Sequence, residues 1–192
     1  VAAHAFASSL QADHLVDRTA RVKITLYGSL ALTGLGHGTD RATMAGLEGN
    51  LPATVDTDHM MHIREICALD DTLNLAGLKR IHFDYDRDVV FEQWKRMAAH
   101  PNGMRFQAFD AAASLVDEQV WYSIGGGFVR KGAPEDPMIG IHERPPEGAS
   151  FADADESSST DFGVEAPYPF SSCTELVSLC REHHLSIAEL VW

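Results

Sequence analysis

The sequence is poor in cysteine, with three among 192 residues: Cys67, Cys173 and Cys180. An odd number at irregular spacings, without a Cys-x-x-Cys pair, predicts no disulfide framework and is typical of a reducing compartment. Three thiols also cannot complete a four-cysteine iron-sulfur site by themselves. If a metal cluster serves this protein, most of its ligands therefore lie elsewhere.

Basic residues and long apolar runs are scarce as well. The 15 Lys and Arg residues against 28 Asp and Glu leave a formal charge of −13, which argues against nucleic acid because phosphate binding needs a basic face. No apolar run approaches the roughly 20 residues that cross a bilayer. The chain begins at Val1 rather than Met and has no signal-peptide pattern. We therefore expect a piece of a longer cytoplasmic protein, without a membrane or nucleic-acid partner.

The acidic residues gather in one segment. Between Gly132 and Ala166, nine acidic residues accompany a single arginine, a net of −8. Prolines and an Asp/Glu/Ser run from Asp153 to Asp161 predict a solvated segment with little regular structure. The chain is therefore expected to divide into a folded domain, an acidic Pro/Ser-rich linker or arm, and a helical segment that leads to another domain: 1–131, 132–166 and 167–192.

Hydrophobic periodicity predicts an α+β fold, a mixed β-sheet packed with helices. Helices are expected over Val1–Thr19, Thr39–Leu47, His59–Leu69, Thr174–His183 and Ser186–Trp192, the third capped by Thr57 or Asp58 and the last by a Ser186/Glu189 capping box. Strands are expected over Val22–Tyr27, Lys79–Tyr85, Met104–Asp110 and Gln119–Ile124, with a loop through Asn74 and Gly77 and a short helix or strand in Val89–Ala98.

The most distinctive stretch is Gly28–Asp40, in which four glycines bracket His37 after an alternating strand. Such a cluster predicts a tight turn with left-handed residues or a close backbone approach, with Thr39 and Asp40 placed to cap the following helix. Two interpretations of His37 stay open on these residues alone. In the first, His37 is presented to a small substrate beside a helix N-terminus, where free N–H groups favour carboxylates. In the second, the histidine only packs against its neighbours or caps a helix.

Two further clusters allow a functional and a structural interpretation. Three consecutive glycines, Gly125–Gly127, end the last strand as a pocket wall or as a bulge and flexible exit. His59 and His62 share a helix face, but no third ligand is nearby, so an ordinary surface helix is favoured over a metal site. No metal ligand is predicted in this chain.

Four motifs, taken in order and with their spacing, point to one family. They are Leu26–Asp40, His100–Phe106, Tyr122–Val129, and Tyr168–Ser172 with Leu179–Glu182. Together they resemble the β-domain and following linker of the iron-sulfur L-serine dehydratases, or L-serine ammonia-lyases. The resemblance covers nearly the whole chain, and the acidic segment matches least.

The resemblance implies a bacterial enzyme of amino-acid degradation and gluconeogenesis that converts L-serine to pyruvate and ammonia. It implies a 4Fe-4S cluster with ligands outside this chain, on a C-terminal catalytic domain that would be its partner. A homodimer is expected as well. The resemblance also implies a fold like the allosteric substrate-binding domain of some phosphoglycerate dehydrogenases. The family's Ser-Ser-His-Thr segment would fall just upstream of Val1, and the catalytic domain has no counterpart here, so this chain alone is expected to be inactive.

With the resemblance added, His37 is favoured as the general base at the domain interface, because elimination of the β-hydroxyl of serine needs a base for the Cα proton. Asp40 is expected to orient the turn or cap the helix. The substrate-binding candidates are Gly36, Gly38, Thr39, Asn102, Gly125, Gly126 and Gly127. The alternatives are a regulatory domain that senses serine or controls assembly without taking part in the chemistry, and a dimerisation scaffold.

Overall fold

A computed structural model of the chain describes residues 1–143, 168, 170 and 172–191. The chain divides into two compact units, Val1–Thr160 and Asp161–Trp192. Most of the predicted acidic linker, from residue 144 on, lies outside the described residues, as do Pro169 and Ser171. The predicted domain boundaries after residues 131 and 166 stay predictions.

One mixed sheet organises the first unit. Its strands are β1 (Arg21–Tyr27), β2 (Thr72–Leu75), β3 (Lys79–His82), β4 (Val89–Glu92), β6 (Gly103–Phe109), β7 (Leu115–Gly125) and β8 (Phe128–Gly132). Their spatial order is β2-β3-β1-β6-β7-β8, and β4 also pairs with β1. Strand β1 runs parallel to β3 and β4 and antiparallel to β6. The predicted α+β class with a mixed sheet is therefore confirmed.

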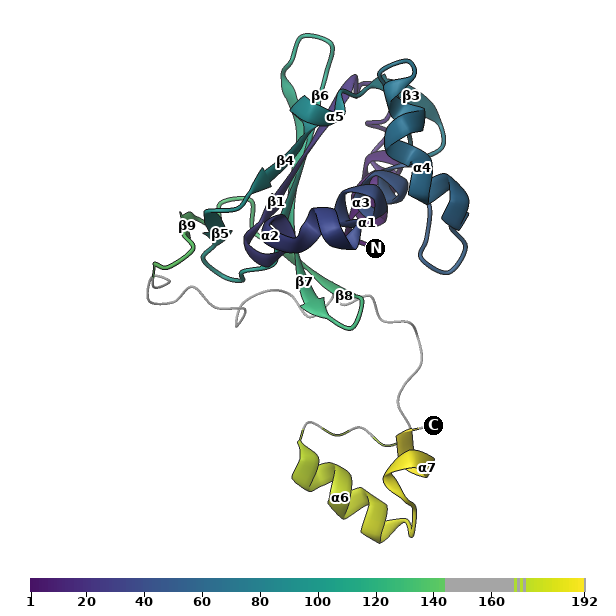
Figure 1. Ribbon diagram of the computed structural model, residues 1–192, viewed down its shortest axis with the longest axis vertical. Helices are drawn as coiled ribbons and strands as arrows, with labels where there is room; N and C mark the ends of the chain where they lie inside the picture. The colour runs from purple at the N-terminus through teal and green to yellow at the C-terminus, as the bar shows by residue number, and fades with distance from the viewer. Residues whose placement is uncertain (144–167, 169, 171, 192) are drawn as a thin grey trace. The chain divides into compact units, whose positions relative to one another are not determined.

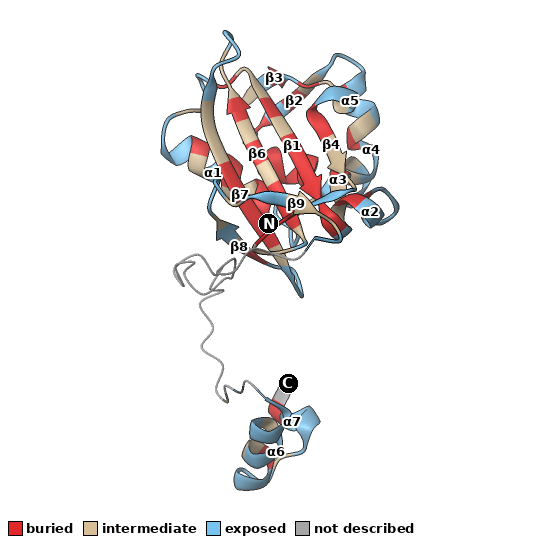
Figure 2. Cartoon of the chain, turned by 90° about the vertical axis from the view of Figure 1, so that its left-hand side faces the viewer, coloured by how far each residue is buried: buried red, intermediate tan, exposed pale blue. Residues whose placement is uncertain are grey.

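Helices cover one face of this sheet. The helices of the first unit are α1 (Ala2–Ala12), α2 (Gly28–His37), α3 (Thr39–Leu47), α4 (Thr57–Ala68) and α5 (Tyr85–Asp88). Helices α1, α3 and α4 lie on the same side of the sheet (Figure 1). Figure 2 looks onto the opposite face, where β5 (Lys95–Met97) and β9 (Met138–Gly140) form a separate two-stranded sheet. In the part of the chain that the structure describes, no helix combines the length and apolarity needed to cross a membrane.

The core lies between the sheet and the helices. Side chains alternate along a strand, so β1 contributes Val22, Ile24 and Leu26 to one buried cluster with α1 and α3. Phe6 of α1 stacks on Phe106 of β6 with the ring centroids 5.3 Å apart. The alanine-rich start of the chain is thus the helix that covers the centre of the sheet.

Several element boundaries differ from those predicted. Helix α1 ends at Ala12 rather than Thr19, because His14 has φ +56°, although Val16 still packs in the core. Helix α4 begins at Thr57 and is capped by Asp56, not by Thr57 or Asp58. A left-handed residue after α1 and a side-chain cap before α4 therefore set these two limits.

The region between α4 and β6 is also more regular than predicted. The expected loop around Asn74 contains β2, which pairs antiparallel with β3. The strand expected over Lys79–Tyr85 ends at His82, and Tyr85 begins α5 after an Asp84 cap. Val89–Ala98, predicted as a short helix or strand, contains β4 and β5. Strands of three or four residues carry too little alternation to be recognised from sequence.

The largest correction concerns the glycine-rich stretch, which forms helix α2 and not a tight turn. A Cβ on Gly34 would lie 3.2 Å from the Phe91 ring and 3.4 Å from Thr39, so this glycine permits close packing inside the helix. The predicted left-handed residues are at its ends, Gly28 with φ +54° and Gly38 with φ +68°. Packing therefore overrides the low helix propensity of glycine.

The second unit contains α6 (Cys173–Glu182) and α7 (Ile187–Val191). The Glu189 side chain accepts from the Ser186 N–H at 2.8 Å, and the Glu189 N–H donates to Ser186 Oγ at 3.2 Å. This reciprocal pair confirms the predicted capping box. The two helices agree with the predicted ones to within a few residues.

Replacing Gly28 by alanine is expected to lower the free energy of unfolding by about 3 kcal/mol, because the residue has a left-handed φ and its Cβ would overlap a neighbour. That Cβ would lie 2.0 Å from the Pro101 carbonyl oxygen. Gly36→Ala is the matched control in the same helix, since its Cβ would meet nothing within 4 Å, and it is expected to be neutral or slightly stabilising. Urea unfolding followed by circular dichroism measures both; equal effects would show that the contact with the Pro101 carbonyl does not restrict the residue at position 28.

Candidate functional site

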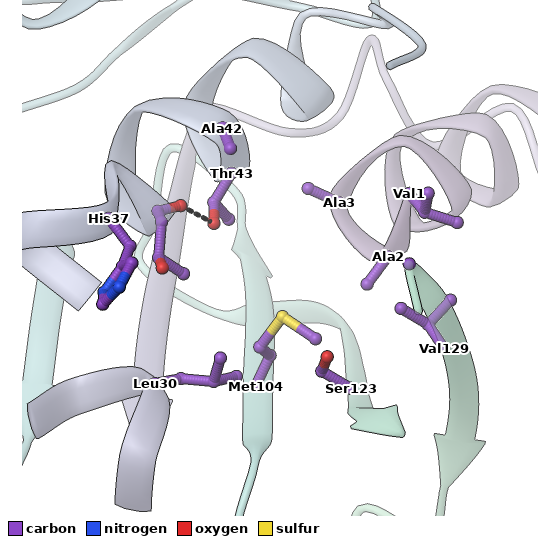
Figure 3. A pocket seen from close by; sticks show the side chains of 12 residues that line it. Val1, Ala2, Ala3, Leu30, His37, Ala42, Thr43, Met104, Ser123 and Val129 are labelled. Carbon is purple, nitrogen blue, oxygen red and sulfur yellow. Dashed lines mark hydrogen bonds between the residues drawn. The ribbon is translucent and has the colours of Figure 1, made fainter. Parts of the chain in front are cut away.

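A pocket of about 270 Å³ lies at the end of the sheet where β6 begins and β7 ends. Its walls come from α1, α2, α3, β6, β7 and the hairpin between β7 and β8 (Figure 3). The lining residues are Val1, Ala2, Ala3, Leu30, His37, Thr39, Ala42, Thr43, Met104, Ser123, Gly127 and Val129. Three of the residues predicted from sequence, His37, Thr39 and Gly127, therefore meet in one place.

His37 is the last residue of α2, and its ring is exposed at the pocket wall. The ring Nδ1 lies 2.9 Å from the Thr33 carbonyl oxygen, one helical turn earlier. A carbonyl only accepts hydrogen bonds, so this contact assigns the proton of the neutral ring to Nδ1. Nε2 then keeps its lone pair, and His37 can take a proton from a molecule in the pocket.

The first turn of α3 adds an anion-favouring wall. The helix begins at Thr39, and its N-cap is Gly38, which makes no side-chain cap. Neither Thr39 nor Asp40 caps it, contrary to the prediction. The first backbone N–H groups of a helix have no acceptor within the helix and carry partial positive charge. Because Thr39 lines the pocket, the start of α3 lies beside His37 there, and a helix N-terminus whose N–H groups are open to a ligand would suit an anion.

Asp40 holds this turn from behind rather than lining the pocket. It is 1% exposed; its Oδ2 accepts from the Tyr85 hydroxyl at 2.7 Å and lies 3.6 Å from the Arg64 guanidinium. Burial and the hydrogen bond to Asp40 raise the pKa of Tyr85. The contacts tie the start of α3 to α4 and α5, in agreement with the expectation that Asp40 orients the turn.

Asn102 also lies outside the pocket lining. Its Oδ1 accepts from the Ser29 hydroxyl of α2, and its Nδ2 donates to the Ser123 carbonyl of β7 at 3.4 Å. Its own carbonyl accepts from the Ser123 N–H at 3.0 Å. The side chain predicted to line the cleft therefore links α2 to β7 beside it.

The remaining predicted glycines shape the backbone around the pocket. Gly36 is exposed on α2, and Gly38 joins α2 to α3. Gly125, Gly126 and Gly127 all have positive φ; Gly125 ends β7 next to an irregularity in strand register, and the other two form the turn to β8. Of these five, Gly127 alone lines the pocket. The sequence allowed the glycine run to be either a bulge or a pocket wall. The hairpin has both an irregular register and one glycine at the pocket.

Sequence reasoning missed Ser123 as a site residue. It is half-buried at the pocket wall, and its hydroxyl has no hydrogen-bond partner among the residues that the structure describes. Its signal was the strand period: Ser123 follows Trp121 by two positions, so both face the helix side of the sheet. Asp117 and Gln119 lie in the same row, but they contact each other and Ser9 of α1. Ser123, whose hydroxyl has no such contact in the described part of the chain, is therefore the candidate ligand for something bound there.

The cysteines do not fit an iron-sulfur site. Cys67 is buried in α4, and burial, with a smaller contribution from Glu48, raises the pKa of its thiol to about 12, whereas cluster ligands are thiolates. Cys173 and Cys180 both lie in the second unit. Within the described ranges, no group of three or more His, Cys, Asp or Glu side chains could hold a metal ion.

The histidine pair on α4 has other partners. The His59 Nε2 lies 2.6 Å from Glu48 Oε2, which links α4 to the end of α3. The His62 Nδ1 lies 2.9 Å from the Asp58 carbonyl oxygen of its own helix. Each ring therefore has a structural contact of its own, in agreement with the surface-helix interpretation.

The raised pKa of the Cys67 thiol predicts selective alkylation. Because the thiol stays protonated well above its usual titration range, iodoacetamide at pH 8 is expected to modify exposed Cys173 quickly and to leave Cys67 unmodified. Peptide mass spectrometry over time measures the two rates, with denatured protein as the control in which both react. Equal rates in the folded protein would show that Cys67 is accessible.

Tyr85→Phe removes the hydroxyl that donates to buried Asp40 and is expected to cost about 1–3 kcal/mol of stability, because the carboxylate loses a partner. The measurement is denaturant unfolding of Tyr85→Phe, Asp40→Ala and the double variant. If the hydrogen bond carries the effect, Tyr85→Phe costs much less in the Asp40→Ala background. Additive effects would assign the loss to packing instead.

Comparison with known proteins shows the family to which the chain belongs. The model of the family described as serine dehydratase beta chain matches residues 1–133. An L-serine dehydratase of Streptomyces coelicolor is 37% identical over 190 residues, 99% of this chain and 38% of that protein. L-serine dehydratase 2 of Escherichia coli is 35% identical over 187 residues, 97% of this chain and 36% of that protein.

The chain spans little more than a third of the length of these curated relatives. The family model, in contrast, matches well over half of the chain. The chain therefore belongs to the serine dehydratase beta chain family, which confirms the family predicted from its four motifs.

Proposed function

We propose that this chain is the domain of an L-serine dehydratase that supplies the general base and part of the pocket wall for the conversion of L-serine to pyruvate and ammonia. The observation that carries the proposal is the placement of His37. Its Nδ1 is engaged by the Thr33 carbonyl, and the ring lines the same pocket as the first turn of α3. A base and a carboxylate site side by side suit an α-amino acid.

The proposed pose follows from the charges of the wall. The substrate carboxylate lies at the N–H groups that begin α3, around Gly38 and Thr39, where a helix N-terminus favours an anion. The Cα–H then faces His37. Gly127 completes the pocket wall at the hairpin, and Gly125 and Gly126 shape that hairpin. Gly36 leaves the surface of α2 without a side chain at its position. Asn102 supports the pocket from beside it.

In the proposed reaction, His37 Nε2 takes the Cα proton, and the Nδ1–H bond to the Thr33 carbonyl stabilises the imidazolium that forms. The electron pair left on Cα expels the β-hydroxyl, which takes the proton from the His37 imidazolium and leaves as water, so that His37 is again neutral. The resulting aminoacrylate hydrolyses to pyruvate and ammonia. A pocket of about 270 Å³ suits an amino acid of this size.

The cysteines described above do not fit as ligands of the 4Fe-4S cluster that the resemblance implies. We therefore propose that this group, with the Lewis-acid chemistry that it supplies, belongs to a C-terminal catalytic domain which is the partner of this chain. The comparisons support this division, because the relatives are more than twice as long as the chain. A homodimer and a cytoplasmic location stay predictions.

The alternative is a serine-sensing or assembly domain without a catalytic group. It depends on the expected likeness to the allosteric substrate-binding domain of phosphoglycerate dehydrogenases, with which a mixed sheet and helices on one face are compatible. In that case His37 would bind the ligand but transfer no proton. Replacing His37 separates the two functions.

His37→Gln in the whole enzyme is expected to lower kcat for L-serine by about 10²- to 10⁴-fold, the usual contribution of a general base. Pyruvate formation after anaerobic reconstitution with iron and sulfide measures the effect, and the absorbance of the cluster shows that it is loaded equally. His62→Gln, an exposed change on α4, is the matched control and should keep full turnover. Near wild-type kcat in His37→Gln would reject the base and favour the sensing domain.

A further inference from the structure

The polar groups of the pocket are divided between two sides. His37, Thr39 and Thr43 belong to α2 and α3, and the Thr43 hydroxyl is already engaged with the Thr39 carbonyl. The sheet side contributes Met104 and Ser123, and Figure 3 shows Met104 between Ser123 and the side that carries His37. Ser123 therefore supplies the polar side chain on the sheet side of an otherwise apolar wall.

The backbone N–H and carbonyl of Ser123 are both hydrogen-bonded to Asn102. The Asn102 carbonyl accepts from the Ser123 N–H at 3.0 Å, and Asn102 Nδ2 donates to the Ser123 carbonyl at 3.4 Å. The Ser123 hydroxyl, in contrast, has no partner among the described residues. A side chain fixed by its backbone, with an unused oxygen at a pocket wall, is prepared for a ligand.

Hydrogen bonds continue from this point to His37. Asn102 Oδ1 accepts from the Ser29 hydroxyl, and the Ser29 carbonyl accepts from Thr33 Oγ1 at 2.9 Å. The Thr33 carbonyl in turn accepts from His37 Nδ1. The position of Ser123 relative to His37 thus depends on a chain of hydrogen bonds and not on packing alone.

The substrate pose leaves one charged group without a partner. With the carboxylate at the start of α3 and the Cα–H toward His37, the α-ammonium faces the sheet side. An ammonium has three donors and no acceptor, and the walls nearby, Leu30, Met104 and Val129, provide apolar side chains. The Ser123 oxygen is the acceptor that this side offers.

Resting on the proposed function, we infer that Ser123 is a substrate-binding residue that accepts a hydrogen bond from the α-ammonium of L-serine. Asn102 is the positioning residue that holds it across the pocket from His37. The pocket then selects an α-amino acid over the corresponding acid without the amine, because that acid leaves the Ser123 oxygen unpaired.

The test is Ser123→Ala in the whole reconstituted enzyme, with two inhibitors that separate the functional groups. L-alanine keeps the ammonium and carboxylate, and 3-hydroxypropanoate keeps the carboxylate and hydroxyl without the ammonium. Ser123→Ala is expected to raise KM for L-serine and Ki for L-alanine about tenfold, the usual scale for a hydrogen bond to a charged group, and to leave Ki for 3-hydroxypropanoate unchanged.

Other results overturn the inference. Unchanged KM and Ki values show that the hydroxyl does not contact substrate, and a rise confined to 3-hydroxypropanoate places it at the β-hydroxyl instead. If either probe fails to inhibit the wild-type enzyme, KM for L-serine decides, and an unchanged KM rejects the role. A change in kcat alone, at constant KM, also rejects it.

Asn102→Ala tests the positioning role. It is expected to raise the same KM and L-alanine Ki, and to add little in the Ser123→Ala background, because both changes remove one contact. A merely structural role gives additive effects. If Asn102→Ala fails to fold, Ser29→Ala removes only the Ser29 hydroxyl that donates to Asn102, and additivity is measured there.

These outcomes are separate from those of the proposed function. If His37→Gln retains turnover, the proposed reaction is wrong whatever Ser123 does. If His37→Gln loses turnover while Ser123→Ala keeps KM and both Ki values, the general base stands and only the assignment of Ser123 is rejected.

Discussion

Strand β1 passes directly into helix α2 at Gly28, and the rest of the site depends on this junction. The residue has a left-handed φ, and the space of its missing side chain is filled by the Pro101 carbonyl. The loop before β6 can therefore lie against the start of α2, which brings Asn102 within reach of Ser29. The direction of α2 then sets where its last residue, His37, meets the pocket.

A second constraint acts on the other side of His37. Gly38 turns the chain from α2 into α3 with a left-handed φ, and buried Asp40 holds the new helix through Tyr85 and Arg64. Burying a carboxylate is costly unless it is paired, so these two contacts are needed for the turn to keep its place. The histidine thus lies between two junctions that are each fixed by contacts distant in sequence.

Strand alternation made much of this fold predictable. Strand β6 alternates between buried and half-buried residues over most of its length, whereas β1 and β7 are buried on both faces over part of theirs. Their apolar residues still recur at period two, and those of the helix that starts at Thr39 recur at the helical period. Helix α2 was not predictable in this way, because its glycines have low helix propensity. The reason for Gly34 appears only in the folded chain, where Phe91 and Thr39 pack closely against it. Short strands such as β2 were missed because four residues show too little pattern.

By itself, the sequence determined the family, the mixed α+β class and the residues His37, Thr39 and Gly127 as candidates, since motif order, strand period and glycine content are local properties of the chain. Only the tertiary structure decided that these three share a pocket, that Asn102 lies beside it and that Ser123 faces into it. The reason is physical: a wall built from β7, α2 and α3 depends on strand register and helix packing, and these join residues that the chain keeps far apart.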